Sequence, residues 1–287
     1  MATIAGSDKP AVSSIALFLD VDGTLLEIAA APQSVSVSGE LRERLRTLSL
    51  AGGGAVALVS GRTIVDLDAL FAPLTLPAAG LHGFEHRSAS GVYRRRAPPS
   101  AAALETARGA MLRIARQHPG LLVEDKHFAL ALHYRGAPEL EDTVVDAMNG
   151  IATSLLGELE LQRGKMVVEL RPTGATKAEA VAAFLAEAPF AGRLPVFIGD
   201  DLTDEPAFEL VNRLNGVSVV VNAARSSAAR ARLPDVTAVH GWLAELQAEP
   251  AAALRRLSGR EHEASACDDS SRAAARGARL RSQGSQG

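Results

Sequence analysis

Ile15-Ala16-Leu17-Phe18-Leu19-Asp20-Val21-Asp22-Gly23-Thr24 is the stretch that decides the fold of this 287-residue chain. Its first five residues are all apolar, without polar alternation, which predicts a strand buried on both faces, as in a parallel sheet. Two carboxylates follow at once, at Asp20 and Asp22. Because open parallel sheets bind ligands at the carboxyl ends of their strands, this acidic pair is a candidate functional site.

Further apolar runs have the same character and alternate with helical patterns. We predict strands over 55–59, 195–198 and 217–221, and helices over 40–50, 65–71 and 204–214. Alternation of strand and helix predicts an α/β fold with a doubly wound, Rossmann-like parallel-sheet core.

Residues 121–135 differ, because apolar and polar side chains alternate there with a period of two. That pattern predicts an antiparallel strand with one covered face. A helix over 139–155 and strands over 158–162 and 166–170 complete a small α+β insert. The predicted division of the chain is an N-terminal tail 1–14, a core 15–102 and 172–249, an inserted cap 103–171, and a disordered C-terminal tail 250–287.

Composition sets limits on partners and location. The net charge is −3, which gives no indication of a nucleic-acid partner. No apolar run reaches the roughly 18 to 20 residues that cross a bilayer, so we expect no membrane partner. The N-terminus lacks the pattern of a secretory signal, and the single Cys267 excludes an intramolecular disulfide. We therefore expect a cytoplasmic protein.

A second acidic cluster, Gly199-Asp200-Asp201-Leu202-Thr203-Asp204, follows another predicted strand. Clustered carboxylates repel one another and are costly to desolvate without a cation, and oxygen ligands favour Mg²⁺. A calcium loop of the EF-hand type is excluded, because a strand precedes Asp20 and the twelfth position is Ala31. Solvated turn acids remain the alternative for either cluster alone.

Two further features could bind an anion. Ser60-Gly61-Arg62 follows a predicted strand and begins a helix, so its hydroxyl and amide groups could face a phosphate, although a plain helix cap is the alternative. Lys177 lies at the start of an Ala-rich helix, where it opposes the helix dipole. An anionic partner would account for it, and ordinary surface exposure is the alternative.

In this order, the first acidic motif, Ser60, Lys177 and the second acidic cluster resemble the four loops of the haloacid-dehalogenase-like (HAD) phosphotransferases. More narrowly, the chain resembles the trehalose-6-phosphate phosphatase family. That resemblance extends over about 15–246 and departs from the family pattern at Val21 and Ala178. It rests on Gly80-Leu81-His82-Gly83, Val123-Glu124-Asp125-Lys126, Ala131-Leu132-His133-Tyr134-Arg135, Gly164-Lys165-Met166-Val167-Val168-Glu169-Leu170-Arg171-Pro172, and Gly199 to Phe208.

The resemblance implies Mg²⁺-dependent hydrolysis of trehalose 6-phosphate to trehalose and phosphate, the last step of trehalose biosynthesis. Asp20 would be the nucleophile that forms an aspartyl-phosphate, and Asp22 the general acid and base. The implied metal ligands are the Asp20 carboxylate, the Asp22 backbone carbonyl and Asp200, with Asp201 and Asp204 behind them to orient ligands or water. Ser60 and Lys177 would be the catalytic residues that hold the phosphoryl oxygens, and Gly61 and Arg62 are expected beside Ser60 as substrate-binding residues.

Substrate specificity is expected in the cap. Glu124 and Lys126 are two residues apart and so share one face of an extended strand, as do His133 and Arg135. Glu169 points away from the apolar side of its own strand. Ordinary surface ion pairing is the alternative for these charges. The resemblance implies that Glu124, Lys126 and Glu169 contact the sugar. His133 and Arg135 are further candidates, and His82 and His86 rank after them.

Other functions stay open at this point. A different sugar-phosphate phosphatase, acting on sucrose phosphate or a hexose phosphate, would share the same core. A phosphosugar mutase and a catalytically silent sugar-phosphate sensor are the more distant alternatives. We expect a small-molecule sugar phosphate as the substrate, a separate trehalose-phosphate synthase as a pathway partner, and a monomer.

Overall fold

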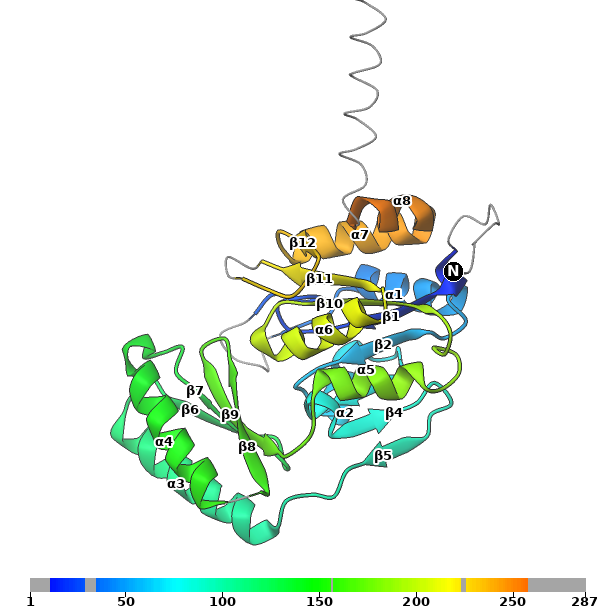
Figure 1. Ribbon diagram of the computed structural model, residues 1–287. Helices are drawn as coiled ribbons and strands as arrows, with labels where there is room; N and C mark the ends of the chain where they lie inside the picture. The colour runs from blue at the N-terminus through cyan, green and yellow to red at the C-terminus, as the bar shows by residue number, and fades with distance from the viewer. Residues whose placement is uncertain (1–10, 29–34, 156, 223–225, 258–287) are drawn as a thin grey trace, which may run out of the picture.

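A computed structural model describes residues 11–28, 35–155, 157–222 and 226–257, which form two β-sheets with helices packed on them (Figure 1). In spatial order the eight strands of the larger sheet are β12 (Ala231–Leu233), β11 (Val217–Val221), β10 (Leu194–Gly199), β1 (Ile15–Leu19), β2 (Val56–Val59), β3 (Ala78–Gly80), β4 (Glu85–Arg87) and β5 (Tyr93–Arg95). The strands from β12 to β3 are parallel, and β4 and β5 extend the sheet in antiparallel fashion. Strand β1 lies between β10 and β2, at the point where the strand order reverses.

Strand β1 is buried on both faces because alternate side chains enter different hydrophobic clusters. Ile15, Leu17 and Leu19 belong to the cluster formed with helices α1 (Gly39–Ala51), α2 (Ile64–Phe71), α7 (Val236–Ala248) and α8 (Pro250–Leu257). Ala16 and Phe18 belong to the cluster formed with α5 (Lys177–Leu185) and α6 (Glu205–Arg213). Helices therefore cover both faces of the sheet, and the predicted doubly wound α/β core is confirmed.

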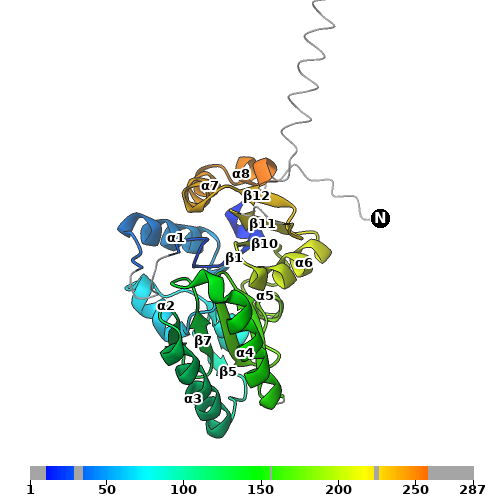
Figure 2. The same cartoon turned by 90° about the vertical axis from the view of Figure 1, so that its left-hand side faces the viewer.

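The smaller sheet lies beside the carboxyl edge of the larger one. Its strands, in spatial order, are β6 (Leu122–Asp125), β7 (Leu130–His133), β9 (Val167–Pro172) and β8 (Leu159–Gly164). Helices α3 (Ala101–Gln117) and α4 (Glu141–Ser154) cover one face of this sheet, as Figure 2 shows, and bury Leu132 and Val168. The opposite face carries the cross-strand row Glu124, Ala131 and Glu169. Antiparallel alternation therefore separates an apolar face from a polar one.

Two predictions need correction. Residues 121–135 are not one strand but a hairpin, because β6 and β7 pair antiparallel around a turn in which His127 has a left-handed φ of 69°. Residues 250–257, predicted as part of a disordered tail, form helix α8. Ala253, Leu254 and Leu257 pack into the core, and the Trp242 indole donates to the Ala253 carbonyl at 2.9 Å. This packing stabilises a helix that would be too short to persist alone.

The predicted division of the chain into core and cap stays a proposal. The first cap element is α3, which begins at Ala101, and the last is β9, which ends at Pro172. Residues 12–14 of the predicted N-terminal tail form a single 3₁₀ turn. Residues 1–10 and 258–287 lie outside the described residues.

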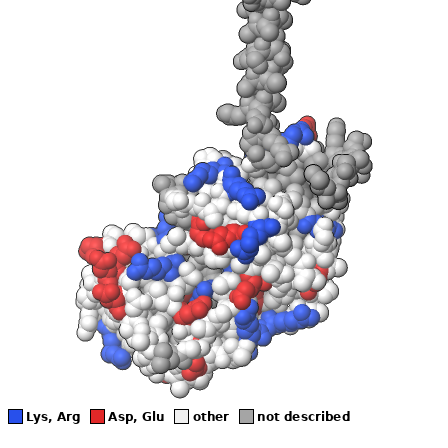
Figure 3. All heavy atoms as spheres, viewed as in Figure 1, with Lys and Arg blue, Asp and Glu red and all other residues white. Residues whose placement is uncertain are grey.

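The exterior shows no dominant charge on the face seen in Figure 3, where acidic and basic side chains are interspersed. Within the described residues, no helix is long and apolar enough to span a membrane.

Candidate active site

Both acidic clusters lie at the carboxyl ends of neighbouring strands. Asp20 follows β1, and its backbone N–H donates to the Ile198 carbonyl on β10 at 2.9 Å. Asp200 follows β10 directly. One carboxylate oxygen from each of Asp20, Asp200 and Asp204 lies within 4.8 Å of the other two. The topology thus brings together acids that are about 180 positions apart in the chain.

Lys177 is the internal counter-ion of this cluster. Its Nζ lies 2.7 Å from Asp20 Oδ1 and 2.6 Å from Asp204 Oδ1, and its side chain is only 3% exposed. Burial by itself would lower the pKa of Lys177, but the two carboxylates raise that pKa above its usual value. The ammonium therefore remains charged, and the alternative of an ordinary surface lysine is wrong.

One ammonium does not balance the carboxylates around it. Burial raises the pKa of Asp20 well above its usual value, although Lys177 opposes this. Burial and the neighbouring Asp204 raise the pKa of Asp200 to about 7. Within the described residues, no hydrogen bond reaches the Asp200 carboxylate, whereas Asp204 uses one oxygen for Lys177 and the other for the Asp201 N–H. The carboxylates of Asp20 and Asp200 are thus suited to bind a divalent cation.

Gly23 makes room for Asp200. Its φ is +84°, and a Cβ at this position would lie 2.0 Å from Asp200 Oδ2. Any other residue would be strained and would displace the carboxylate. Glycine is therefore required at position 23 of the first acidic motif because Asp200 of the second acidic cluster occupies the space beside it.

Asp22 and Arg62 form a two-point ion pair. Arg62 Nε donates to Asp22 Oδ2 at 2.7 Å, and Nη2 donates to Oδ1 at 2.6 Å. The Arg62 backbone N–H donates to the buried Ser60 hydroxyl at 3.2 Å. The sequence indicated roles for all three residues but gave no signal for the pairing, because Asp22 and Arg62 are 40 positions apart.

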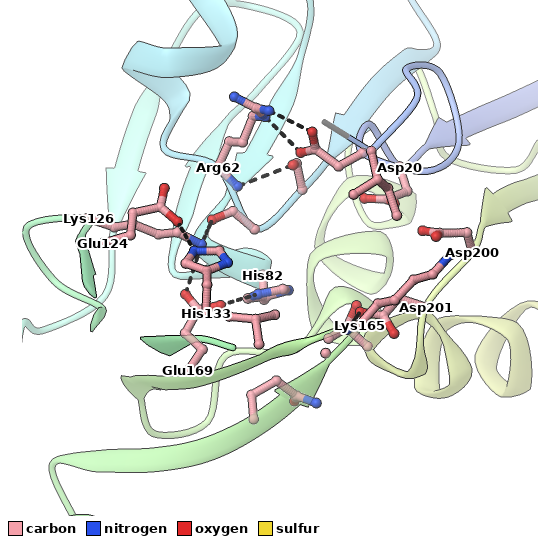
Figure 4. Close-up of a pocket in the computed structure, with 18 of the residues that line it drawn as sticks. Asp20, Arg62, His82, Glu124, Lys126, His133, Lys165, Glu169, Asp200 and Asp201 are labelled. Carbon is pink, nitrogen blue, oxygen red and sulfur yellow. Dashed lines mark hydrogen bonds and ion pairs between the residues drawn. The ribbon is translucent and has the colours of Figure 1, made fainter. Parts of the chain in front are cut away.

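The polar face of the cap sheet forms the other end of the site, and Figure 4 shows these side chains across the cavity from Asp20 and Asp200. Glu124 Oε2 lies within hydrogen-bonding distance of His133 Nε2, at 2.8 Å. Lys126 Nζ lies 3.3 Å from Glu169 Oε1 and donates to the Gly61 carbonyl at 3.2 Å. Burial alone would raise the pKa of Glu169, but Lys126 and His82 lower it to about 2. Glu169 is buried and the Lys126 side chain is only 14% exposed, so ordinary surface ion pairing is excluded for them.

A single cavity contains nearly all of the residues singled out from the sequence. Its lining includes Asp20, Asp22, Ser60, Gly61, Arg62, Glu124, Lys126, His133, Arg135, Glu169, Lys177, Asp200 and Asp201. Of the predicted site residues, Asp204 alone is absent from that lining, since it is fully buried behind Lys177. Their individual roles stay predictions.

The cavity also contains His82, which the sequence suggested only as a lesser candidate for a sugar contact, and residues to which no role was assigned, among them Gln162, Lys165 and Thr203. Asp201, expected beside the metal ligands, accepts the Leu202 N–H at 2.7 Å and the Lys165 N–H at 3.2 Å. Because Lys165 lies at the tip of the β8–β9 hairpin, Asp201 links the core to the cap.

Known proteins with similar sequences include phosphatases, as the groups in this site suggest. A profile of the trehalose-phosphatase family matches residues 18–237. The trehalose-6-phosphate phosphatase of Escherichia coli (strain K12) is 44% identical over 238 residues, which are 83% of this chain and 88% of that protein. A probable trehalose-phosphate phosphatase of Sinorhizobium fredii is 42% identical over 232 residues, 80% of this chain and 87% of that protein.

A solved structure of a similar protein has the same fold. The C-terminal domain of C. albicans trehalose-6-phosphate phosphatase aligns with a TM-score of 0.71 at 22% identity, over 86% of this chain and 92% of that one. The predicted HAD-like fold class is thereby confirmed. The profile match and the two relatives establish that the chain belongs to the trehalose-phosphatase family.

Proposed function

We propose that this protein hydrolyses trehalose 6-phosphate to trehalose and phosphate through an aspartyl-phosphate on Asp20. The observation that carries the proposal is the single cavity that joins two different ends. At one end Asp20 lies against the Lys177 ammonium and beside Asp200, as phosphoryl transfer requires. At the other end the cap supplies Glu124, Lys126 and Glu169, which suit the hydroxyl groups of a sugar.

The reaction has two displacements. An Asp20 carboxylate oxygen attacks phosphorus and the bond from phosphorus to the sugar oxygen breaks, while Asp22 gives a proton to the departing oxygen. In the second step Asp22 takes a proton from water, the water oxygen attacks phosphorus, and Asp20 is released as a carboxylate with free phosphate. The Lys177 ammonium stabilises the negative charge on the transferring group in both steps.

Arg62 controls when Asp22 is free to act. Both oxygens of Asp22 accept hydrogen bonds from Arg62. A substrate phosphate offers the guanidinium the same two-point geometry with more negative charge, so phosphate and Asp22 compete for Arg62. Phosphate entry therefore releases the Asp22 carboxyl for proton transfer.

We propose Mg²⁺ as the cation, held by the carboxylates of Asp20 and Asp200 and the backbone carbonyl of Asp22. A hard cation of this kind binds through one or two carboxylates, water and substrate phosphate, and it would draw negative charge from the phosphoryl oxygens. Asp204 fixes Lys177 and the Asp201 loop rather than completing this set of ligands. The half-buried Asp200 carboxylate, which no hydrogen bond reaches within the described residues, supports the assignment.

The disaccharide is proposed from the polarity of the cap face and from the relatives, which are phosphatases of trehalose phosphate by name. We further propose that a separate synthase supplies the substrate, and that the protein acts as a cytoplasmic monomer. The cap would close over the sugar and admit only the attacking water.

A phosphate-release panel tests the proposal. Trehalose 6-phosphate should be hydrolysed with a kcat/KM at least about tenfold above that of glucose 6-phosphate or sucrose 6-phosphate. Chelation by EDTA should abolish turnover, and added Mg²⁺ should restore it. Equal rates on all three substrates would refute the disaccharide assignment and favour a general sugar-phosphate phosphatase.

A pair of substitutions tests the cap assignment. Glu169→Gln should lower kcat/KM for trehalose 6-phosphate about tenfold more than for p-nitrophenyl phosphate, which has no sugar. Glu187→Gln is the matched control, because Glu187 also pairs with a histidine, His86, at 3.1 Å but lies outside the cavity. Equal losses on both substrates with Glu169→Gln would contradict the assignment.

A further inference from the structure

His82 lies between the phosphate loop of the core and the cap sheet. It belongs to the short 3₁₀ turn η3 (Leu81–Gly83) after β3, has a left-handed φ of 58°, and is only 6% exposed. Its backbone N–H donates to the Ser60 carbonyl at 2.9 Å. A non-glycine residue adopts this backbone conformation only when its surroundings impose it, so the direction of the ring is determined by the fold.

The imidazole contacts both parts of the molecule. His82 Nε2 lies 3.2 Å from Glu169 Oε2 on cap strand β9 (Figure 4). On its other side, a Cβ added at Gly61 would lie 2.8 Å from the same nitrogen. Gly61 is therefore required because the ring occupies the space beside the phosphate loop.

The hydrogen on the ring can be assigned from its neighbours. Glu169 is ionised, so it only accepts, and Nε2 must carry the hydrogen that it donates. Burial lowers the pKa of His82, although Glu169 opposes this, so the ring is neutral and Nδ1 is an acceptor. That Nδ1 is buried and has no hydrogen-bond partner in the described part of the chain. An orphaned buried acceptor destabilises the fold, which indicates that the histidine is kept for a purpose other than stability.

Lys126 completes the arrangement from the cap side. It donates to Glu169 Oε1, while His82 donates to Oε2, so each oxygen of the carboxylate has one fixed donor. Both donors also touch Gly61, Lys126 through the Gly61 carbonyl and His82 through ring packing. The position of Glu169 is therefore defined relative to the loop that carries Ser60 and Arg62.

We propose that His82 is a positioning residue that fixes Glu169 against the phosphate loop, so that sugar and phosphate are bound in one geometry. The proposal rests on the proposed function, because it assigns to His82 the recognition of the sugar rather than the chemistry at phosphorus. It places a core residue, outside the cap, among the determinants of substrate specificity.

Three variants test it in steady-state assays with trehalose 6-phosphate and p-nitrophenyl phosphate. His82→Asn tolerates the left-handed backbone but is too short to reach Glu169, and it should raise KM for trehalose 6-phosphate about tenfold. The loss in kcat/KM should be about tenfold larger than with p-nitrophenyl phosphate. His82→Gln places an N–H donor near the original Nε2 and should recover most of the loss. His86→Asn is the control, since it removes a histidine–glutamate contact outside the cavity.

Two results would overturn the proposal. One is an equal loss on both substrates, which would mean that His82 only supports the phosphate loop. The other is an unchanged KM for trehalose 6-phosphate in folded His82→Asn. Should that variant not fold, the ¹⁵N spectrum of the wild-type imidazole replaces it: the proposal requires an Nε2-protonated neutral ring whose signals shift in Glu169→Gln, and the other tautomer would refute it.

The wild-type enzyme separates this proposal from the proposed function. A wild type that does not prefer trehalose 6-phosphate refutes the function itself, whatever the His82 variants do. A wild type with the expected preference, combined with failure of the His82 series, refutes only the positioning role.

Discussion

Replacing Lys177 by Met removes the cation on which the buried acidic cluster depends. In the wild type the ammonium lies 2.7 Å from Asp20 and 2.6 Å from Asp204, and those two side chains are 5% and 0% exposed. Methionine has a similar length but no charge. Lys177→Met therefore leaves two buried carboxylates facing each other without a counter-ion.

The expected loss of stability follows from this geometry. Breaking a buried ion pair by removing one partner costs about 3–5 kcal/mol, because the remaining charge is buried and uncompensated. With a urea dependence of about 3 kcal/mol per molar, the unfolding midpoint should fall by about 1–1.7 M. In the proposed reaction the Lys177 ammonium stabilises the transferring phosphoryl group. Loss of its charge should therefore also lower kcat by about 10²–10³-fold.

The assay is urea unfolding in EDTA, where no cation replaces the ammonium, followed by phosphate release in Mg²⁺. Lys165→Met is the matched control, because Lys165 lines the same cavity but is exposed, and its stability should change by less than about 0.5 kcal/mol. Adding Asp204→Asn to Lys177→Met should recover part of the loss, since it removes one of the two stranded charges. An unchanged midpoint in Lys177→Met would refute the role of Lys177 as the counter-ion.

Three further outcomes are expected. Asp20→Asn should lower phosphate release at least about 10⁴-fold without loss of the fold, as judged by circular dichroism, and normal turnover would exclude Asp20 as the nucleophile. Mg²⁺ at 100 times its Kd should stabilise the wild type by about 2.7 kcal/mol in thermal unfolding, and Asp200→Asn should abolish that shift. Because the folded-state pKa of Glu169, about 2, lies below its usual value of 4.5, its contribution of about 3 kcal/mol is present above pH 4.5 and is lost as the pH falls towards 2. Urea unfolding at pH 2 to 6 should therefore be less pH-dependent in Glu169→Gln than in the wild type, and equal slopes would contradict the pairing.

Features that depend on neighbouring residues were predictable. The unbroken apolar run of β1 and the acids directly after it are local, so the strand and the position of Asp20 follow from the sequence pattern. Period-two alternation likewise identified the polar face of the cap. The hairpin turn near His127 was missed because no Gly or Pro marks it, although the polar run 124–127 interrupts the alternation there.

Features that depend on packing were not predictable. The sequence of helix α8 is short and rich in Ala and Arg. The helix forms because Ala253, Leu254 and Leu257 pack into the hydrophobic core. The sequence suggested His82 only as a lesser candidate for a sugar contact, since its position depends on a left-handed turn and on Glu169, 87 positions away. A charged residue in a sequence has many possible partners, and only the path of the backbone selects one.

The sequence by itself determined the α/β class, the two acidic clusters, the lysine and the family, because each depends on residue type and short-range order. Only the tertiary structure decided that Arg62 holds Asp22, that Lys177 lies between Asp20 and Asp204, and that Glu169 is held from both core and cap. These contacts join residues 27 to 157 positions apart. Their energies depend on distance and burial in space, which the order of residues along the chain does not specify.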